Sequence, residues 1–252
     1  MSEARALRER DIVVEKNKIK RHGFSGRFVH WTVALSTIAL VISGLGQLPL
    51  FKRYYVDQLP GLGWTSDFSV TLQIHYLAAA ALTLAVVYHI VYHGLRREFS
   101  ILPRRGDLKE SYQIIKAMLG RGEEPDSDKY LAEQRVAYAF IGAAVLLVIG
   151  TGYLKVFKNF AGVDLPYWLL WTTTTLHNVA MFLIILGVLG HLAAFLFKEN
   201  RALLPGMFSG KIDLHYARER HCLWCERLGI HGHHDPESSR DSLKGADGRR
   251  AA

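Results

Sequence analysis

The sequence predicts an all-α integral membrane protein whose core is a bundle of four transmembrane helices. Three observations support this: 50% of the residues are hydrophobic, they are gathered in long blocks, and basic residues are concentrated between alternate blocks. Each block is about as long as the 20 residues that cross the roughly 30 Å hydrocarbon layer of a membrane. The predicted helices are Phe28–Phe51, Val70–Leu95, Val136–Phe157 and Thr174–Phe197.

These blocks divide the chain into an N-terminal arm, residues 1–25, a helical core, residues 26–200, and a C-terminal tail, residues 201–252. The arm is polar and basic, and it contains neither a short apolar core nor a small-residue cleavage site. We therefore expect the first block to remain in the protein rather than to be removed as a signal peptide. The polar end of the tail, "ESSRDSLKGADGRRAA", is typical of disorder.

The net charge of +8 is distributed as in a membrane protein rather than a nucleic-acid-binding protein. Cations lie in the arm, between the second and third blocks, and in the tail. The other two loops, 52–69 and 158–173, contain as cations only Lys52, Arg53 and Lys158. By the positive-inside bias, both termini and the central loop face the cytoplasm, which predicts a multi-pass protein of the bacterial inner membrane.

The central loop has one segment with helical periodicity. In residues 107–120, apolar side chains recur at Leu108, Tyr112, Ile115 and Leu119. This spacing predicts an amphipathic helix that lies along the cytoplasmic face of the membrane. An ordinary surface helix that contacts a soluble partner is the less favoured alternative.

Histidines at membrane depth are the candidate functional residues. A lone histidine in a membrane helix usually makes an interhelical hydrogen bond, but several on interior faces favour ligation. His75 and His89 are fourteen positions apart, and so are His177 and His191. Fourteen residues of α-helix correspond to a rise of about 21 Å and a rotation about 40° short of four turns. Each pair therefore occupies one helix face at two levels. The histidines are His30, His75, His89, His177 and His191, followed closely by His93.

The absence of cysteines and carboxylates from the same blocks disfavours zinc or di-iron sites. Paired imidazoles at two levels instead favour two haem b groups, each held between helices. With the N-terminus inside, His75 and His177 lie at the outer level. The inner level combines His191 with either His30 or His89, and symmetry slightly favours His89.

A weak internal repeat supports a duplicated helical hairpin. "VISGLG" at 41–46 resembles "VIGTG" at 148–152, and each precedes a short loop and a helix with a histidine pair. Glycines in this core would let the backbone approach a porphyrin, although helix–helix packing explains them equally well. These glycines are Gly142, Gly150, Gly152, Gly187 and Gly190.

Several motifs resemble the cytochrome b gamma subunit of respiratory formate dehydrogenases, and the related cytochrome b subunits of nickel–iron hydrogenases and thiosulfate reductases. The resemblance covers about residues 20–228 and rests on "RFVHW" (27–31), "LQIHYLAA" (72–79), "KYLAEQR" (129–135), "LHNVAM" (176–181) and "LGHLAAFLF" (189–197). It implies that His30, rather than His89, completes the inner haem site. It also implies an iron–sulfur subunit and a molybdenum or tungsten catalytic subunit as partners, and menaquinone or ubiquinone as the electron acceptor.

The chain departs from that family pattern at two places. His89 is an additional histidine, and Leu131 replaces a polar residue that precedes a "GQ" pair in the family, with Glu133 and Gln134 following. Because family quinone pockets lie near this segment, Gln134 is a candidate quinone contact.

The tail contains the motif "HCLWC", with Cys222 and Cys225. It is not a haem c attachment sequence, because Glu226 follows the second cysteine. With nearby histidines it would bind zinc or nickel; alternatively, both residues are unliganded thiols.

We therefore expect a dihaem electron-transfer subunit without catalytic residues of its own, which carries electrons from an outer partner to a quinone near the cytoplasmic surface. Alternatives in the same class are the anchor of a hydrogenase and a quinol-oxidising donor to a periplasmic multihaem protein. A histidine-based ion transporter is disfavoured because no proline interrupts a predicted helix at its midpoint. A purely structural anchor would not require buried histidines.

Overall fold

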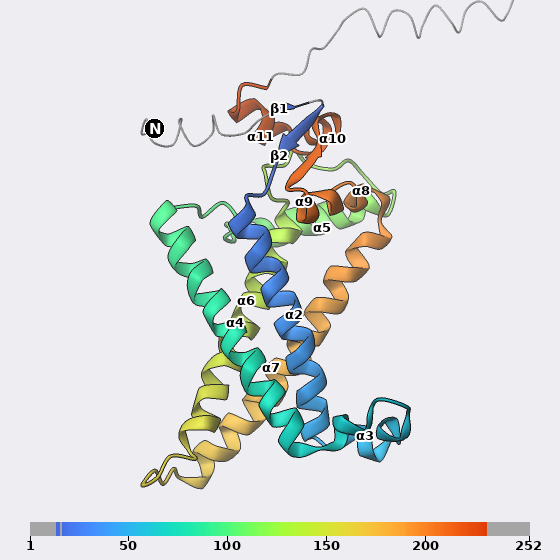
Figure 1. The fold of residues 1–252 in the computed structure, drawn as a ribbon. Helices are drawn as coiled ribbons and strands as arrows, with labels where there is room; N and C mark the ends of the chain where they lie inside the picture. The colour runs from blue at the N-terminus through green and yellow to red at the C-terminus, as the bar shows by residue number, and fades with distance from the viewer. Residues whose placement is uncertain (1–13, 16, 231–252) are drawn as a thin grey trace, which may run out of the picture.

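The computed structural model describes residues 14–15 and 17–230. Its body consists of four long helices, α2 (Phe24–Gln47), α4 (Phe68–Arg96), α6 (Ala132–Phe157) and α7 (Tyr167–Ala193) (Figure 1). All four are long and apolar enough to cross a membrane. The prediction of a mostly helical chain with four membrane-spanning helices is therefore confirmed.

The ends of these helices differ from the predicted ends for local reasons. α2 stops at Gln47, before Pro49, and the remainder of the predicted helix forms the separate α3 (Leu50–Arg53). α6 and α7 both begin earlier than hydropathy predicts. The buried Arg135 belongs to the first turn of α6, and the polar run 172–175 lies inside α7. At the start of α6, hydropathy alone misplaces the helix because Arg135 has the carboxylate of Asp107 as a partner inside the protein.

The four helices form two hairpins, because α2 packs most closely with α4 and α6 with α7. The first hairpin turns through α3 and the short 3-10 helices η1 (Val56–Gln58) and η2 (Gly63–Ser66). The helices cross near their middles and spread apart toward both ends (Figure 1). At the crossing, Leu82, Ala144, Val145 and Ile184 are buried together, which we call the mid-bundle layer. This layer separates the two ends of the bundle.

Large apolar side chains cover the outer faces of the helices. Leu77 and Leu84 on α4 are 74% and 71% exposed, and Leu186 on α7 is 62% exposed. Such exposure would be unfavourable in water but is expected of helices that face lipid.

A small folded unit, which we call the cap, covers one end of the bundle (Figure 1). It comprises residues 14–23 as far as they are described and residues 198–230. Its strands β1 (Val14–Glu15), β2 (Lys18–Lys20) and β3 (Lys211–Asp213) form an antiparallel sheet in that order. Its helices are α8 (Lys198–Arg201), α9 (Leu204–Phe208), α10 (Leu214–Arg220) and α11 (Cys222–Arg227), with η3 (Ala194–Leu196) leading into them from α7.

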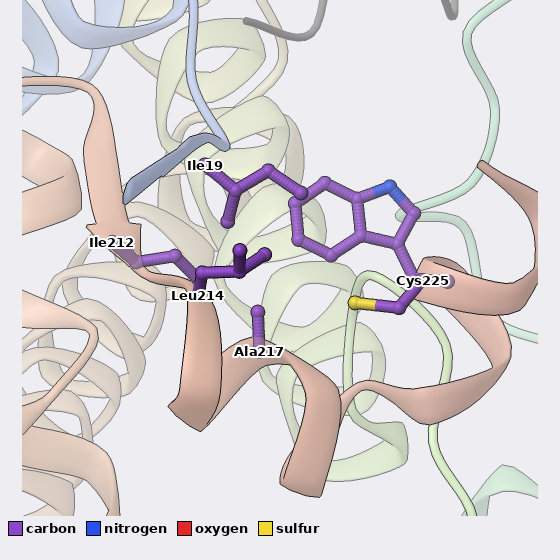
Figure 2. Packing of buried hydrophobic residues seen from close by; sticks show 6 residues of the cluster. Ile19, Ile212, Leu214, Ala217 and Cys225 are labelled. Atoms are coloured by element: carbon purple, nitrogen blue, oxygen red, sulfur yellow. The ribbon is translucent and has the colours of Figure 1, made fainter. Parts of the chain in front are cut away.

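The cap joins the N-terminal arm to the C-terminal tail, which the sequence analysis treats as separate segments. Ile19 of β2 pairs in register with Ile212 of β3, and both are buried. Figure 2 shows these two side chains gathered with Leu214, Ala217 and Cys225 into one apolar cluster. The sheet is an addition to the predicted all-α architecture. The predicted disorder of residues 237–252 lies outside the described residues.

The central loop contains a helix at the predicted place, α5 (Asp107–Met118), at the same end of the bundle as the cap (Figure 1). Ile114 on its inner face is buried with Leu131 and Ala132 at the start of α6. The carboxylate of Asp107 accepts two hydrogen bonds from Arg135, at 2.7 and 2.9 Å. The apolar residues of the predicted stripe remain exposed on the other face: Leu108, Tyr112, Ile115 and Leu119.

Candidate functional site

Two histidines face each other at the end of the bundle remote from the cap. His75 is on α4 and His177 is on α7, and their ring centroids are 6.3 Å apart. The two residues belong to different hairpins, so this outer pair bridges the hairpins. The sequence analysis predicts this pairing, and the structure brings the two rings together.

A second pair lies near the cap. His30 on α2 and His191 on α7 have ring centroids 6.3 Å apart, and they also belong to different hairpins. The start of α2 is attached to the cap here, because the Trp31 indole donates to the carbonyl of Met207 at 3.1 Å and the Arg27 guanidinium donates to that of Phe208. We call His30 and His191 the inner pair.

The separation within each pair fits ligation of one metal from two opposite sides. A metal–nitrogen bond of about 2.0 Å, with about 1.1 Å from nitrogen to ring centre, places two opposite imidazole centres about 6.2 Å apart. The centroids of both pairs are 6.3 Å apart, close to that value. With no carboxylate or thiol among the four side chains, this donor set suits the iron of a haem better than a structural zinc.

The outer histidines are oriented by hydroxyl groups of the neighbouring helix. The Oγ of Ser43 lies 2.9 Å from Nδ1 of His75, and Oγ1 of Thr151 lies 2.9 Å from Nδ1 of His177. Both hydroxyls donate their own hydrogen to a backbone carbonyl one turn earlier, at 2.7 Å. They therefore accept from Nδ1–H, which leaves Nε2 of each ring unprotonated and able to coordinate.

The same arrangement occurs once in each hairpin. Ser43 is followed by Gly44 and Thr151 by Gly152, inside the two segments of the predicted repeat. A Cβ added at Gly44 would lie 3.6 Å from His75 Cε1, and one at Gly152 would lie 3.4 Å from His177 Cε1. The repeat is therefore a hydroxyl–glycine pair that holds an outer histidine.

The other glycines proposed to admit a porphyrin differ in their surroundings. A Cβ at Gly187 would come within 2.9 Å of Ile141, so this glycine serves the packing of α6 against α7. A Cβ at Gly142, Gly150 or Gly190 would meet no heavy atom within 4 Å. Among the five glycines predicted from sequence, Gly152 is the one beside a candidate ligand.

His89 lies apart from both pairs. Its Nε2 is 2.9 Å from the Tyr138 hydroxyl on α6, and its ring centroid is 4.5 Å from that of His93. Symmetry between the hairpins would place His89 opposite His191. In the structure, His30 lies opposite His191 instead.

Sequence reasoning missed three residues at the outer level. Ser43 and Thr151 are inconspicuous in a sequence, because hydroxyl residues in a helix ordinarily bond to their own backbone. Lys155 on α6 interacts electrostatically with both His75 and His177. Lys155 could have been found from the sequence, because it is a cation within the third apolar block.

The segment that contains the candidate quinone contact Gln134 begins α6. Gln134 Oε1 accepts hydrogen bonds from Arg21, at 3.2 Å, and from the backbone N–H of Leu131, at 3.3 Å. Both carboxylate oxygens of Glu133 are buried without a hydrogen-bond partner among the described residues. The start of α6 therefore holds a buried polar group that is partly unsatisfied, next to Arg21 of the cap.

The cysteine motif belongs to the cap. Cys222 Sγ is 3.3 Å from Asp126 Oδ1, and Cys225 is buried in the apolar cluster of Figure 2. Burial raises the pKa of both thiols. Among residues 14–15 and 17–230, no group of three or more potential ligands is close enough to hold a metal ion. The neighbouring His231, His233 and His234 lie outside that part of the chain.

A bundle of four membrane-spanning helices, in which α2, α4 and α7 carry paired histidines at two levels, is typical of a membrane-embedded b-type cytochrome. The sequence model of the family described as prokaryotic cytochrome b561 matches residues 21–210, and the chain belongs to this family. Membership implies binding of haem b and a role in electron transfer.

The relatives narrow the comparison within that family. The cytochrome b556(Fdn) subunit of the nitrate-inducible formate dehydrogenase from Escherichia coli (strain K12) is 21% identical over 212 residues, which cover 83% of this chain and 91% of the relative. The Shigella flexneri protein of the same description matches to the same extent. The resemblance predicted from the motifs is thus confirmed.

Proposed function

We propose that this chain is the dihaem cytochrome b subunit of a formate-dehydrogenase-like complex, in which it passes electrons from an outer iron–sulfur partner to a quinone. The observation that carries the proposal is the presence of two histidine pairs, each with ring centroids 6.3 Å apart. A single structural hydrogen bond between helices would require neither this repetition nor this spacing.

Each histidine pair holds one haem. His75 and His177 hold the outer haem, and His30 and His191 hold the inner one. When bound, the two haems supply one-electron transfer between the ends of the bundle. The fourteen-residue spacing on α7 separates the two levels by about 21 Å along the helix.

The orientation follows from charge and from the exposed apolar faces. The cap and α5 lie on the cytoplasmic side of a bacterial inner membrane, because the cations of the described cap residues and of the central loop are at this end of the bundle. Exposed Leu108, Tyr112 and Leu119 on α5 then rest on the membrane surface.

The proposed partners follow from the relatives. The relatives are subunits of a formate dehydrogenase. An iron–sulfur subunit with a molybdenum or tungsten catalytic subunit would supply electrons at the outer level. The quinone, menaquinone or ubiquinone, would be reduced at the inner level near Gln134 and Glu133.

Haem quantitation is the first test. Purified protein analysed as the pyridine haemochrome should contain two b haems per chain, because there are two matching histidine pairs. One haem or none would contradict the proposal.

The second test concerns direction. In sealed vesicles of uniform orientation with an external electron donor, quinone reduction at the inner level moves negative charge inward. The opposing potential costs about 2.3 kcal/mol per charge per 100 mV for a full crossing. An uncoupler should therefore accelerate quinone reduction. An unchanged rate, with no potential reported by a dye, would place the quinone on the outer side.

A further inference from the structure

Four titratable side chains follow one another at the cap end of the bundle, outside both histidine pairs. The Tyr138 hydroxyl on α6 is 2.9 Å from His89 Nε2 on α4. The His89 ring is 4.5 Å, between centroids, from the ring of His93. His93 Nδ1 is 3.3 Å from Glu98 Oε2, just beyond the end of α4. We call Glu98, His93, His89 and Tyr138 the polar series.

The polar series leads from the surface into the bundle. The Glu98 side chain is 39% exposed, and that of His93 is 26% exposed. His89 and Tyr138 lie deeper, on helices that belong to different hairpins. Because His89 and His93 are four positions apart, they share one face of α4. One end of the series therefore meets solvent, and the other reaches the space between the hairpins.

A structural role accounts for only part of this arrangement. An interhelical hydrogen bond requires His89 and Tyr138, but it gains nothing from His93 and Glu98. Ionisable side chains at membrane depth are costly and commonly form proton relays. Imidazole suits such a relay because it can accept a proton at one nitrogen while it releases one from the other.

The surroundings of the polar series are mixed in charge. Besides Glu98, the charged groups that act on His93 are Arg96 and Lys129, and the ring of Tyr92 contacts it edge-on. Tyr130 interacts electrostatically with Tyr138. The two cations oppose accumulation of positive charge on His93, which favours passage of a proton over its storage there.

The inner end of the polar series lies beside the candidate quinone segment. Tyr138 is four residues after Gln134 on α6, so the two side chains project from the same helix face. A quinone near Gln134 would lie on the side of α6 to which Tyr138 also belongs.

We propose that the polar series conducts protons from the cytoplasmic surface to the quinone, in the order Glu98, His93, His89, Tyr138. The inference rests on the proposed function, which delivers two electrons to each quinone. Each residue accepts one proton and releases one: Glu98 protonates His93, His93 passes a proton to His89, and His89 passes one to the Tyr138 oxygen as its hydroxyl proton leaves for the quinone. Two such passages with two electrons convert the quinone into quinol.

The test uses the full chain with both haems in lipid nanodiscs. The haems are reduced with stoichiometric dithionite and mixed with a soluble naphthoquinone or a short-chain ubiquinone, and haem reoxidation is followed in the visible spectrum. Proton uptake is followed with a pH dye. The variants are Glu98→Gln, His93→Gly, His89→Gln and Tyr138→Phe, of which Glu98→Gln and Tyr138→Phe alter shape least.

We expect every variant to retain two haems and to lose about 100-fold or more in reoxidation rate, the size of effect expected for one general acid. The loss should grow as the pH rises, because fewer protons are then available from solution. Added imidazole should restore the rate of His93→Gly.

A matched control exists in the cap. His215 and Glu219 form a similar pair, 3.4 Å apart, with side chains 80% and 67% exposed. His215→Gly should leave the rate unchanged with and without imidazole. This control separates rescue of the relay from a general effect of the base.

The outcomes distinguish the two proposals. Variants that match the unsubstituted rate at every pH would overturn the relay alone. Loss of the inner haem in His89→Gln would also overturn the relay, because it would make His89 a ligand. Failure of the unsubstituted protein to transfer electrons to either quinone would overturn the proposed function and the relay with it.

Discussion

The outer and inner histidine pairs have the same ring separation but different surroundings. At the outer level, each histidine is hydrogen-bonded by a buried hydroxyl from the other helix of its own hairpin. At the inner level, Nδ1 of His30 is buried without a partner among the described residues, and the His191 side chain is exposed. The outer pair is symmetric and tightly held, whereas the inner pair is neither.

This difference marks where the two hairpins depart from the repeat predicted from the sequence. A strict repeat would place His89 opposite His191, as His75 stands opposite His177. Instead His30 stands opposite His191, and His89 contacts Tyr138. The outer pair, at the end proposed to receive electrons, has the symmetric arrangement. The inner pair, at the end where the proposed chemistry also needs protons, does not.

Removal of a ligand should have the largest effect on this comparison. His177→Ala should abolish the outer haem and His191→Ala the inner one, because an iron left with one imidazole loses its low-spin ligation. Haemochrome content and low-temperature spectra would show the loss of one haem in each case.

His89→Gln serves as the control and should retain both haems. If His89→Gln loses the inner haem while His30→Ala keeps it, the inner assignment is wrong.

Removal of the orienting hydroxyls should distinguish the levels more finely. Ser43→Ala and Thr151→Val should weaken outer haem binding about 10- to 100-fold, as is typical when a hydrogen bond to a ligating histidine is lost. The inner haem should be unaffected. Haem release to apomyoglobin measures both.

Thr83→Val is a matched control, since that hydroxyl donates to Ala79 within its own helix, at 2.8 Å. Equal release from Thr83→Val would show that the hydroxyls stabilise the helices rather than the ligands.

A steric change at the outer end should destabilise that level. A Cβ at Gly46 would lie 2.5 Å from the Thr65 carbonyl oxygen and 2.8 Å from Thr71 Cγ2, so the backbone must move. Gly46→Ala should cost about 1–3 kcal/mol, as overpacked sites do. The expected readout is a lower temperature for loss of the outer haem spectrum.

Gly26→Ala is the control, because a Cβ at this position of α2 would meet no heavy atom within 4 Å. An effect at Gly26 as large as that at Gly46 would mean that alanine acts on the helix as a whole rather than through the contact with Thr65.

Mild acid should loosen the cap. His221 is fully buried, bonded to Arg21 at 2.7 Å and to the Asp128 carbonyl at 2.8 Å. Burial, reinforced by the charge of Arg21, lowers the pKa of His221 to about 3. Between pH 6.5 and that value the unfolded chain binds more protons, so cap stability falls with falling pH, by about 2 kcal/mol at pH 5.

Amide hydrogen exchange, corrected for its intrinsic pH dependence, should show α10 and α11 opening at pH 5 while α3 and η2 stay unchanged. Equal protection of α10 and α11 at pH 7 and pH 5 would contradict this.

Hydropathy and charge predicted the four helices because each is apolar along a membrane-spanning length. No knowledge of tertiary contacts was needed. The helix at α5 was predictable for a related reason, since its apolar side chains recur with helical spacing. The cap was not predictable: its strands have two or three residues and its helices four to seven, too short for a period to appear.

The histidines and the outer pair were predictable from the sequence, but the inner pair was not. Membrane depth singled out His30, His75, His89, His177 and His191, and spacing assigned two levels. The choice between His30 and His89 depends on how α2 and α4 cross. The spacing of residues along a single helix gives no information about that crossing. The hydroxyls of Ser43 and Thr151 escaped notice because their partners are distant in the sequence.

The mid-bundle layer has a consequence for energy conservation. Its members, Leu82, Ala144, Val145 and Ile184, bear no hydrogen-bonding side chain. Electrons can tunnel through such packed hydrocarbon, whereas a proton needs a string of donors and acceptors or of water molecules. Under the proposed function, the layer thus behaves like the dielectric of a charged capacitor: charge is displaced across it, and no leakage current discharges the membrane.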